Sequence, residues 1–173
     1  SSVEIIWGDA RETIKSIAED IKFDLILLDA FSPSHCPELW TEDFLHTLCS
    51  KLNPEGKLIT YCTAAAIRGS LRRAGMELRS IKPNTNSLRY WSEGTIAILK
   101  TKNQLSLSCD QKSNFAKLSQ MEEEHLLTRA AIPYRDSNGM STSKDILKRR
   151  KAEQELSNLE TTINWRKRWK KLL

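Results

Sequence analysis

One apolar run that ends abruptly in polar residues constrains the fold of this chain more than any other feature. Residues 23–33 read FDLILLDAFSP. Residues 25–28 are apolar without alternation, which is typical of a central parallel strand covered on both faces. Asp29 then stands at the carboxyl end of that strand, where open α/β sheets bind their ligands. The run therefore predicts a buried strand that leads into a site. From these residues alone, Asp29 as a cap of the next turn and Phe31 as ordinary core are equally good interpretations.

Strand-like and helix-like segments alternate around this run. Four further stretches have the apolar character of strands, namely 3–7, 57–62, 76–82 and 94–100. Three stretches repeat apolar residues at helical spacing, namely 14–21, 41–52 and 64–74. Thr41 is the expected N-cap of the second helix, and Gly75 the expected left-handed end of the third. This order predicts an α/β fold with a mostly parallel sheet, helices on both faces and an antiparallel end strand.

Composition narrows the class of protein. The 173 residues are 28% charged and 39% hydrophobic, with a mean hydropathy of −0.48. No apolar run approaches the roughly 20 residues that span a bilayer, and residues 1–3 show no signal-peptide pattern. The four cysteines lie far apart without a C-x-x-C pair, and the three histidines have no metal-ligand spacing. These features predict a soluble cytoplasmic protein with reduced thiols, no membrane partner and no metal.

Positive charge is concentrated at the C-terminus. Residues 144–173 contain ten Lys or Arg and four Asp or Glu, a net charge of +6 against +5 for the whole chain. Trp165 and Trp169 alternate with basic residues, a pattern that suits phosphate contacts and base stacking. Two other interpretations remain open: a solvated helix, and tryptophans that dock on the body of the protein. We therefore expect a basic helical tail over residues 141–173, after a linker and short helix over residues 102–140.

An ordered series of short motifs resembles the MnmC-type tRNA methyltransferases. Each motif is common in isolation, and the similarity rests on their order and spacing over about residues 3–82: GDA at 8–10, DAFSP at 29–33, PELWT at 37–41, TY at 60–61 and AIRGSLRRAG at 66–75. Enzymes of this family use S-adenosyl-L-methionine to convert the 5-aminomethyl group of a wobble uridine in tRNA to 5-methylaminomethyl. The resemblance implies the C-terminal portion of a Rossmann-like methyltransferase sheet, with a methyltransferase domain over residues 1–101.

The resemblance also implies roles for individual residues. Asp9 would accept a hydrogen bond from the exocyclic amine of adenine, and Ala10 would offer a backbone amide; capping of the next helix is the alternative role of Asp9. Asp29 and Ala30 would lie at the cofactor, and Asp29 would hold the attacking amine and take its proton. Other residues would form the substrate pocket, namely Phe31, Ser32, Pro33, Trp40 and Tyr61. For the three aromatic residues, packing is the favoured alternative.

Basic side chains are the expected contacts with tRNA. They lie on the helix over residues 64–74, in the loop over residues 83–93 and in the tail, and are Arg68, Arg72, Arg89, Arg166, Lys167, Arg168 and Lys170.

The glycines depart from the family pattern. The six glycines, at positions 8, 56, 69, 75, 94 and 139, form no G-x-G-x-x-G turn, and residues 3–7 resemble the third strand of the fold. We therefore expect an N-terminally truncated fragment that lacks its first strands and glycine-rich turn, and that is inactive alone.

Two other functions stay open at this point. A polyamine aminopropyltransferase also has a Gly-Asp turn and an apolar strand that ends in Asp. A non-catalytic binding module with the same fold is the second alternative.

Overall fold

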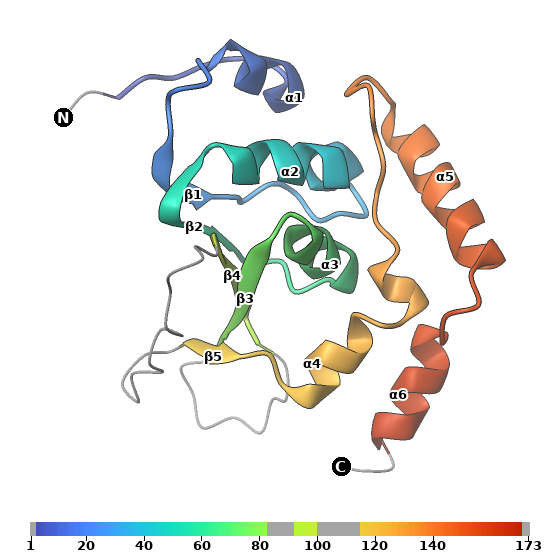
Figure 1. The fold of residues 1–173 in the computed structure, drawn as a ribbon. Helices are drawn as coiled ribbons and strands as arrows, with labels where there is room; N and C mark the ends of the chain where they lie inside the picture. The colour runs from blue at the N-terminus through green and yellow to red at the C-terminus, as the bar shows by residue number, and fades with distance from the viewer. Residues whose placement is uncertain (1–2, 83–91, 100–114, 171–173) are drawn as a thin grey trace.

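The computed structural model describes residues 3–82, 92–99 and 115–170 (Figure 1). Arg89 and Cys109 lie outside the described residues. In this part of the chain, no helix is long and apolar enough to cross a membrane. The five strands of the sheet stand in the order β1-β2-β4-β3-β5, and their bounds are Phe23–Leu27 (β1), Leu52–Thr60 (β2), Met76–Ile81 (β3), Gly94–Leu99 (β4) and Phe115–Lys117 (β5).

The sheet is mixed, which agrees with the expected α/β class. β1 and β2 pair in parallel, and β4 is antiparallel to both of its neighbours. β1, β2 and β3 therefore point the same way. The expected antiparallel end strand, β4, lies inside the sheet, and the short antiparallel β5 forms the edge beyond β3. An inner position suits β4 because Ile96, Ala97 and Ile98 are all buried there.

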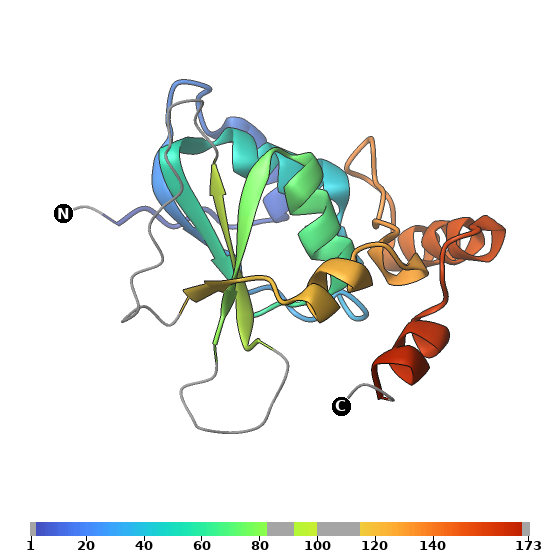
Figure 2. The same ribbon diagram turned by 60° about the horizontal axis from the view of Figure 1, so that its bottom comes forward.

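Two helices cover one face of this sheet. α2 (Glu42–Ser50) connects β1 to β2, and α3 (Ala65–Arg73) follows β2. Both connections move along the sheet in the same direction, so right-handed crossovers place both helices on the same side. Figures 1 and 2 show them side by side, and they contact each other. These two helices therefore do not provide the cover on both faces that we expected.

The apolar run at the start of the chain does not form the expected strand. Residues 3–7 have no strand partner among the described residues, and Val3 and Trp7 are each 88% exposed. β1 is correspondingly an edge strand whose Leu25 and Leu27 are 50% and 69% exposed. The prediction of a strand buried on both faces is thus wrong for this structure. An unbroken apolar run suits a strand that is buried on both faces, but burial requires helices packed on both faces of the sheet. Leu25 and Leu27 are alternate residues and so lie on the same face, which is the exposed one.

Local signals place the start of α2 and the end of α3 correctly. The Thr41 hydroxyl accepts a hydrogen bond from the Phe44 amide at 3.3 Å and so caps α2. Gly75, just beyond α3, has a φ of +84°. The first helix is shorter than its apolar pattern predicts: α1 (Ala10–Thr13) tightens into the 3-10 turn η1 (Ile14–Ser16), and Ile17 is already extended.

The expected break at residues 53–56 becomes a bulge within β2. Phe23 pairs with Leu52 and Leu25 with Lys57, so the intervening residues of β2 loop out of register. Glu55 takes a φ of +68° in this bulge. The strand consequently begins five residues earlier than the predicted 57–62.

The C-terminal part of the chain is helical and lies beside α2 and α3 (Figure 1). The bounds are η3 at Arg129–Ala131, α4 at Gln120–His125, α5 at Ser143–Leu156 and α6 at Thr162–Lys170. Ser119 and Glu122 form a capping box that begins α4, and the side chain of Thr142 caps α5. Figure 1 shows α5 and α6 on the side of α2 and α3 that lies away from β1. The core thus continues from the sheet through α3 to Ile146 of α5.

Candidate active site

The loop after β1 is held by two aromatic side chains. The Leu28 amide still bonds to the Ile59 carbonyl at 2.9 Å, so the parallel pairing ends immediately before Asp29. The Tyr61 hydroxyl, which follows β2, donates to the Ala30 carbonyl at 2.8 Å. The Trp40 indole, in the 3-10 turn η2 (Pro37–Trp40), donates to the Phe31 carbonyl at 2.6 Å. Asp29 therefore stands at the carboxyl end of the parallel pair on a backbone anchored from two directions.

The three aromatic residues of this loop differ in exposure. Trp40 is fully buried, and its ring meets that of Tyr61 edge to face with 6.0 Å between centroids. Tyr61 is 44% exposed and Phe31 82% exposed. Burial, and then the charges of Cys62, Asp29 and Cys36, raise the pKa of Tyr61 above its usual value. The phenol is thus a protonated donor near Asp29, Phe31 is accessible to a partner, and Trp40 supports the loop from within.

Ser32 organises the next turn of the loop. Its carbonyl accepts the amides of His35 and Cys36 at 2.8 and 2.9 Å. Its hydroxyl lies 2.8 Å from the His35 Nδ1 atom and 3.0 Å from the Ser34 hydroxyl. Pro33 stands inside this turn, and Pro37 is buried at its end. Sequence reasoning did not single out His35, although a histidine two residues after an S-P pair was available as a signal.

Asp9 caps α1 and is gripped by the side chain of Arg11. Its Oδ1 accepts the Arg11 amide at 2.9 Å. The Arg11 Nε lies 3.2 Å from both carboxylate oxygens, and the Nη2 lies 2.7 Å from Oδ2. These bonds hold the pKa of Asp9 below its usual value. The Asp9 side chain remains 44% exposed, so the capping role leaves it accessible.

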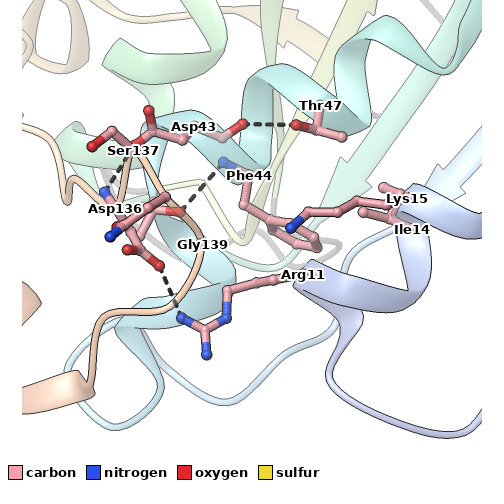
Figure 3. Close-up of a pocket in the computed structure, with 11 residues that line it drawn as sticks. Arg11, Ile14, Lys15, Asp43, Phe44, Thr47, Asp136, Ser137 and Gly139 are labelled. Atoms are coloured by element: carbon pink, nitrogen blue, oxygen red, sulfur yellow. Dashed lines mark hydrogen bonds and ion pairs between the residues drawn. The ribbon is translucent and has the colours of Figure 1, made fainter.

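The same arginine reaches a distant part of the chain. The Arg11 Nη1 donates to Asp136 Oδ2 at 2.9 Å and to the Ser141 carbonyl at 3.0 Å. Figure 3 shows Arg11 pointing toward Asp136 beside a cavity of about 160 Å³, which α1, α2 and the loop after η3 line. α1 also contacts η2. The helix that begins just after Asp9 therefore contacts the segment that follows Asp29. Sequence reasoning missed Arg11 and Asp136.

The structure divides the predicted RNA contacts. The Arg68 side chain is only 2% exposed and forms an ion pair with Glu122 at 2.8 Å, so this expectation is corrected: a buried, paired guanidinium has no free surface for a phosphate. Arg72 is 43% exposed and pairs with Glu123. Arg89 lies outside the described residues. Arg166, Lys167 and Lys170 are exposed on α6.

Arg168 and both tryptophans belong to the docking face of α6. Arg168 pairs with Glu124 and Glu160, and the Trp169 indole donates to Glu124 at 3.0 Å. Trp165 is 1% exposed and stacks on His125 with centroids 4.4 Å apart. Burial, and then the charges of Arg166 and Arg68, lower the pKa of His125 to about 4. α6 therefore presents one face to α4 and a separate basic face to solvent.

Neither metal ligands nor bridged cysteines mark the described part of the chain. Among residues 3–82, 92–99 and 115–170, no group of three or more His, Cys, Asp or Glu side chains could hold a metal ion. Cys36, Cys49 and Cys62 are free thiols. Burial raises the pKa of Cys49 to about 12, so this thiol is a core residue and a poor nucleophile.

Two proteins of known sequence resemble this chain over different lengths. A protein of Methanocaldococcus jannaschii named Uncharacterized protein MJ0670 is 30% identical over 155 residues, which is 89% of this chain and 39% of that protein. The tRNA 5-methylaminomethyl-2-thiouridine biosynthesis bifunctional protein MnmC of Azoarcus sp. (strain BH72) is 36% identical over 74 residues, 43% of this chain and 11% of that protein. The chain thus spans less than half the length of each relative.

A solved structure and a family model complete the comparison. The crystal structure of MNMC2 from Aquifex aeolicus matches with a TM-score of 0.74 and 28% identity, over 89% of this chain and 45% of that one. This match and that of MJ0670 must both extend past residue 101. Residues 1–89 match the model of the S-adenosyl-L-methionine-dependent methyltransferase family. The chain belongs to this family of S-adenosyl-L-methionine-dependent methyltransferases, and within it to the MnmC type.

Proposed function

We propose that the protein methylates the amino group of a 5-aminomethyl wobble uridine in tRNA, with S-adenosyl-L-methionine as methyl donor. The observation that carries this proposal is the position of Asp29. It follows the last hydrogen bond of a parallel strand pair, on a loop that Tyr61 and Trp40 hold by its carbonyl groups. A fixed carboxylate at the carboxyl end of such a pair is suited to orienting a substrate amine.

The Asp9 turn fits the adenine end of the cofactor. The Asp9 carboxylate is 44% exposed, and its Oδ2 bonds only to the Arg11 side chain among the described residues. The Arg11 Nε–H is shared between the two carboxylate oxygens, so only three N–H groups, including those of the Arg11 amide and Nη2, meet the roughly four acceptor sites of the carboxylate. One acceptor site is therefore left for a further donor such as an exocyclic amine. Asp9 and Ala10 would hold the adenine, and Asp29 and Ala30 would lie nearer the reacting groups. When bound, the cofactor supplies an activated methyl group.

The proton balance gives Asp29 its task. A primary amine is protonated near neutral pH, so it must lose a proton before its lone pair can attack. A carboxylate within hydrogen-bond reach holds the amine, and accepts the proton or passes it to water. Phe31 is exposed beside this position and offers an aromatic face to the cationic amine. Ser32, Pro33 and Tyr61 would complete the pocket wall.

The proposal also includes a cellular location, domain bounds and the activity of the chain by itself. Transfer RNA as partner places the protein in the cytoplasm, which agrees with the three free thiols among the described residues. We assign residues 1–101 to the methyltransferase domain and residues 141–173 to the basic tail. The 173-residue chain alone would be inactive, because its six glycines form no turn for the methionine part of the cofactor.

Mass analysis of wobble uridines tests the proposed reaction. In a strain that lacks the whole gene, tRNA should accumulate 5-aminomethyl uridines and should no longer contain the methylated form. The wild-type gene should restore methylation, and the Asp29→Ala gene should not. Unchanged uridines together with altered polyamines would instead indicate an aminopropyltransferase.

A further inference from the structure

Arg11 connects the Asp9 turn to a loop more than a hundred residues later in the chain. One edge of its guanidinium faces the Asp9 carboxylate, through the Nε and Nη2 atoms. The Nη1 atom faces the other way, toward Asp136 Oδ2 at 2.9 Å and the Ser141 carbonyl at 3.0 Å. The Arg11 side chain is 13% exposed and that of Asp136 is 0% exposed. The Arg11 guanidinium is thus hydrogen-bonded on both of its edges.

The loop that receives Arg11 is itself closed by hydrogen bonds. The Asp136 Oδ1 accepts the Ser141 amide at 3.0 Å, and the Gly139 amide donates to the Asp136 carbonyl at 3.0 Å. The Asp136 amide donates to Asp43 of α2 at 2.8 Å, as Figure 3 shows. Burial raises the pKa of Asp136, but the bonds from Ser141 and Arg11 outweigh it, so the carboxyl stays ionised. Arg11 therefore pairs with an Asp136 carboxylate that is ionised and held in place by the loop.

The need for an anchor follows from the size of α1. This helix has only four residues, and an exposed ion pair between residues two apart gains little, because holding two flexible side chains costs conformational entropy. Asp136 and Ser141 remove that freedom from Arg11. Because the guanidinium is planar and rigid, fixing its Nη1 edge also fixes the Nε and Nη2 edge that bonds to the Asp9 carboxylate. The Asp9 carboxylate is then held in one orientation.

We propose that Arg11 is a positioning residue for the cofactor, and that Asp136 and Ser141 of the C-terminal part use it to orient the Asp9 carboxylate toward adenine. The inference rests on the proposed function, since it takes Asp9 as the acceptor of the adenine amine. It assigns a role in cofactor selection to Asp136 and Ser141, which lie far beyond the methyltransferase motifs at positions 8–75.

The test measures preference for the adenine amine and needs no turnover. The chain is titrated, with amide chemical shifts as the readout, with 5′-methylthioadenosine and with its analogue that lacks the 6-amino group. Wild type should prefer the amine by roughly tenfold or more, the size expected for one hydrogen bond to a charged acceptor. Asp136→Asn, which keeps shape but removes the anion, should lose most of this preference. Arg11→Lys should lose it too, since an ammonium keeps the charge but cannot grip on two sides.

Glu122→Gln is the matched control. It weakens the other buried ion pair of the C-terminal part, with Arg68, and does not touch Arg11. It should lower the melting temperature and keep the amine preference. A normal preference in Asp136→Asn would overturn the inference and leave the proposed function intact, as would an equal loss in Glu122→Gln. A wild-type chain without any amine preference would overturn both the adenine role of Asp9 and the inference.

Discussion

At the scale of single residues, the loop after β1 shows how neighbouring side chains hold the backbone beside Asp29. Asp29 lies just beyond the strand pairing, but the carbonyls of the next two residues accept bonds from Tyr61 and Trp40. Catalysis of methyl transfer depends mainly on alignment of nitrogen, methyl and sulfur. In the reaction that we propose, a fixed loop would help to align a substrate amine that Asp29 binds.

Removing the Asp29 carboxylate should abolish most of the activity and leave the fold intact. In the active enzyme, Asp29→Ala should lower methyl transfer by roughly 10²–10⁴, the range of a positioned proton acceptor. Single-turnover assays with labelled cofactor measure the rate, and circular dichroism measures the fold. Asp24→Ala, which removes a β1 carboxylate that bonds to Asn53, should retain wild-type turnover. Wild-type turnover in Asp29→Ala would assign that residue to capping alone.

His125 should make the stability of the protein depend on pH. Its pKa is about 4 in the fold and near 6.5 when unperturbed, so the unfolded chain binds a proton that the folded chain does not between these values. Stability should then fall as pH drops from about 6.5 to about 4. The positive charges of Arg166 and Arg68 add to the effect of burial on this pKa. His125→Phe, which keeps an aromatic ring on Trp165, should show a smaller fall in melting temperature over this range. An equal fall in both proteins would contradict the assignment.

At the scale of elements, α6 has one face that packs on the protein and another that carries exposed basic side chains. Trp165, Arg168 and Trp169 face the rest of the protein and bind to His125 and Glu124 of α4. Arg166, Lys167 and Lys170 are exposed on the same helix. Both sequence interpretations of this tail, docked tryptophans and available positive charge, are therefore compatible, because they concern different faces of one helix.

The exposed face should bind RNA and the docking face should not. Replacing Arg166, Lys167 and Lys170 with Gln should weaken tRNA binding and flatten its salt dependence by about one unit of slope for each phosphate that is no longer neutralised. Filter binding across a salt series measures the slope. The control Arg168→Gln breaks pairs with Glu124 and Glu160 and should lower the melting temperature without changing the slope. An unaltered slope in the triple variant would identify α6 as a solvated helix.

At the scale of the whole molecule, two ion pairs with buried members tie the C-terminal part to the methyltransferase motifs. Arg11 pairs with Asp136, and Arg68 of α3 pairs with Glu122 of α4. Arg68 also donates to the hydroxyls of Thr95 and Ser92 and to the Gly94 carbonyl. This one side chain thus joins α3, β4 and α4.

Breaking the Arg68 pair should be costly, and removing it entirely should cost less. Arg68→Met leaves the Glu122 carboxylate buried without its cation and should destabilise the protein by about 3–5 kcal/mol. The double variant Arg68→Met with Glu122→Leu removes the stranded charge and should recover much of this loss. Urea unfolding gives both values. Equal destabilisation in the single and double variants would show that packing, and not the uncompensated charge, sets the cost.

The affinity for S-adenosyl-L-methionine should show which parts of this cofactor the 173-residue chain binds. Because its glycines form no G-x-G-x-x-G turn, the methionine part of S-adenosyl-L-methionine should add little to the affinity. We expect S-adenosyl-L-methionine and 5′-methylthioadenosine to bind this chain equally weakly in calorimetric titrations. Tight binding of S-adenosyl-L-methionine alone would show that other residues hold its methionine part.

Features that depend on a few adjacent residues could be predicted from the sequence by itself. The Thr41 cap, the left-handed Gly75 and the end of a strand just before Asp29 are all present as expected. The motif series at residues 8–75 identified the family in the same way, because each motif is a short local pattern.

Only the tertiary structure decided where each side chain meets its partners. The apolar run at 23–28 forms an edge strand on which Leu25 and Leu27 are exposed. Burial of both faces requires covering helices, which the local sequence does not describe. Arg68 lies in the interior and not on an RNA-binding face, because a glutamate 54 residues away neutralises it. Arg11 bonds to both Asp9 and Asp136, and Asp136 lies 125 residues beyond Arg11 in the chain. Local patterns carry propensity, whereas burial and charge pairing arise from contacts between segments that are distant in the chain.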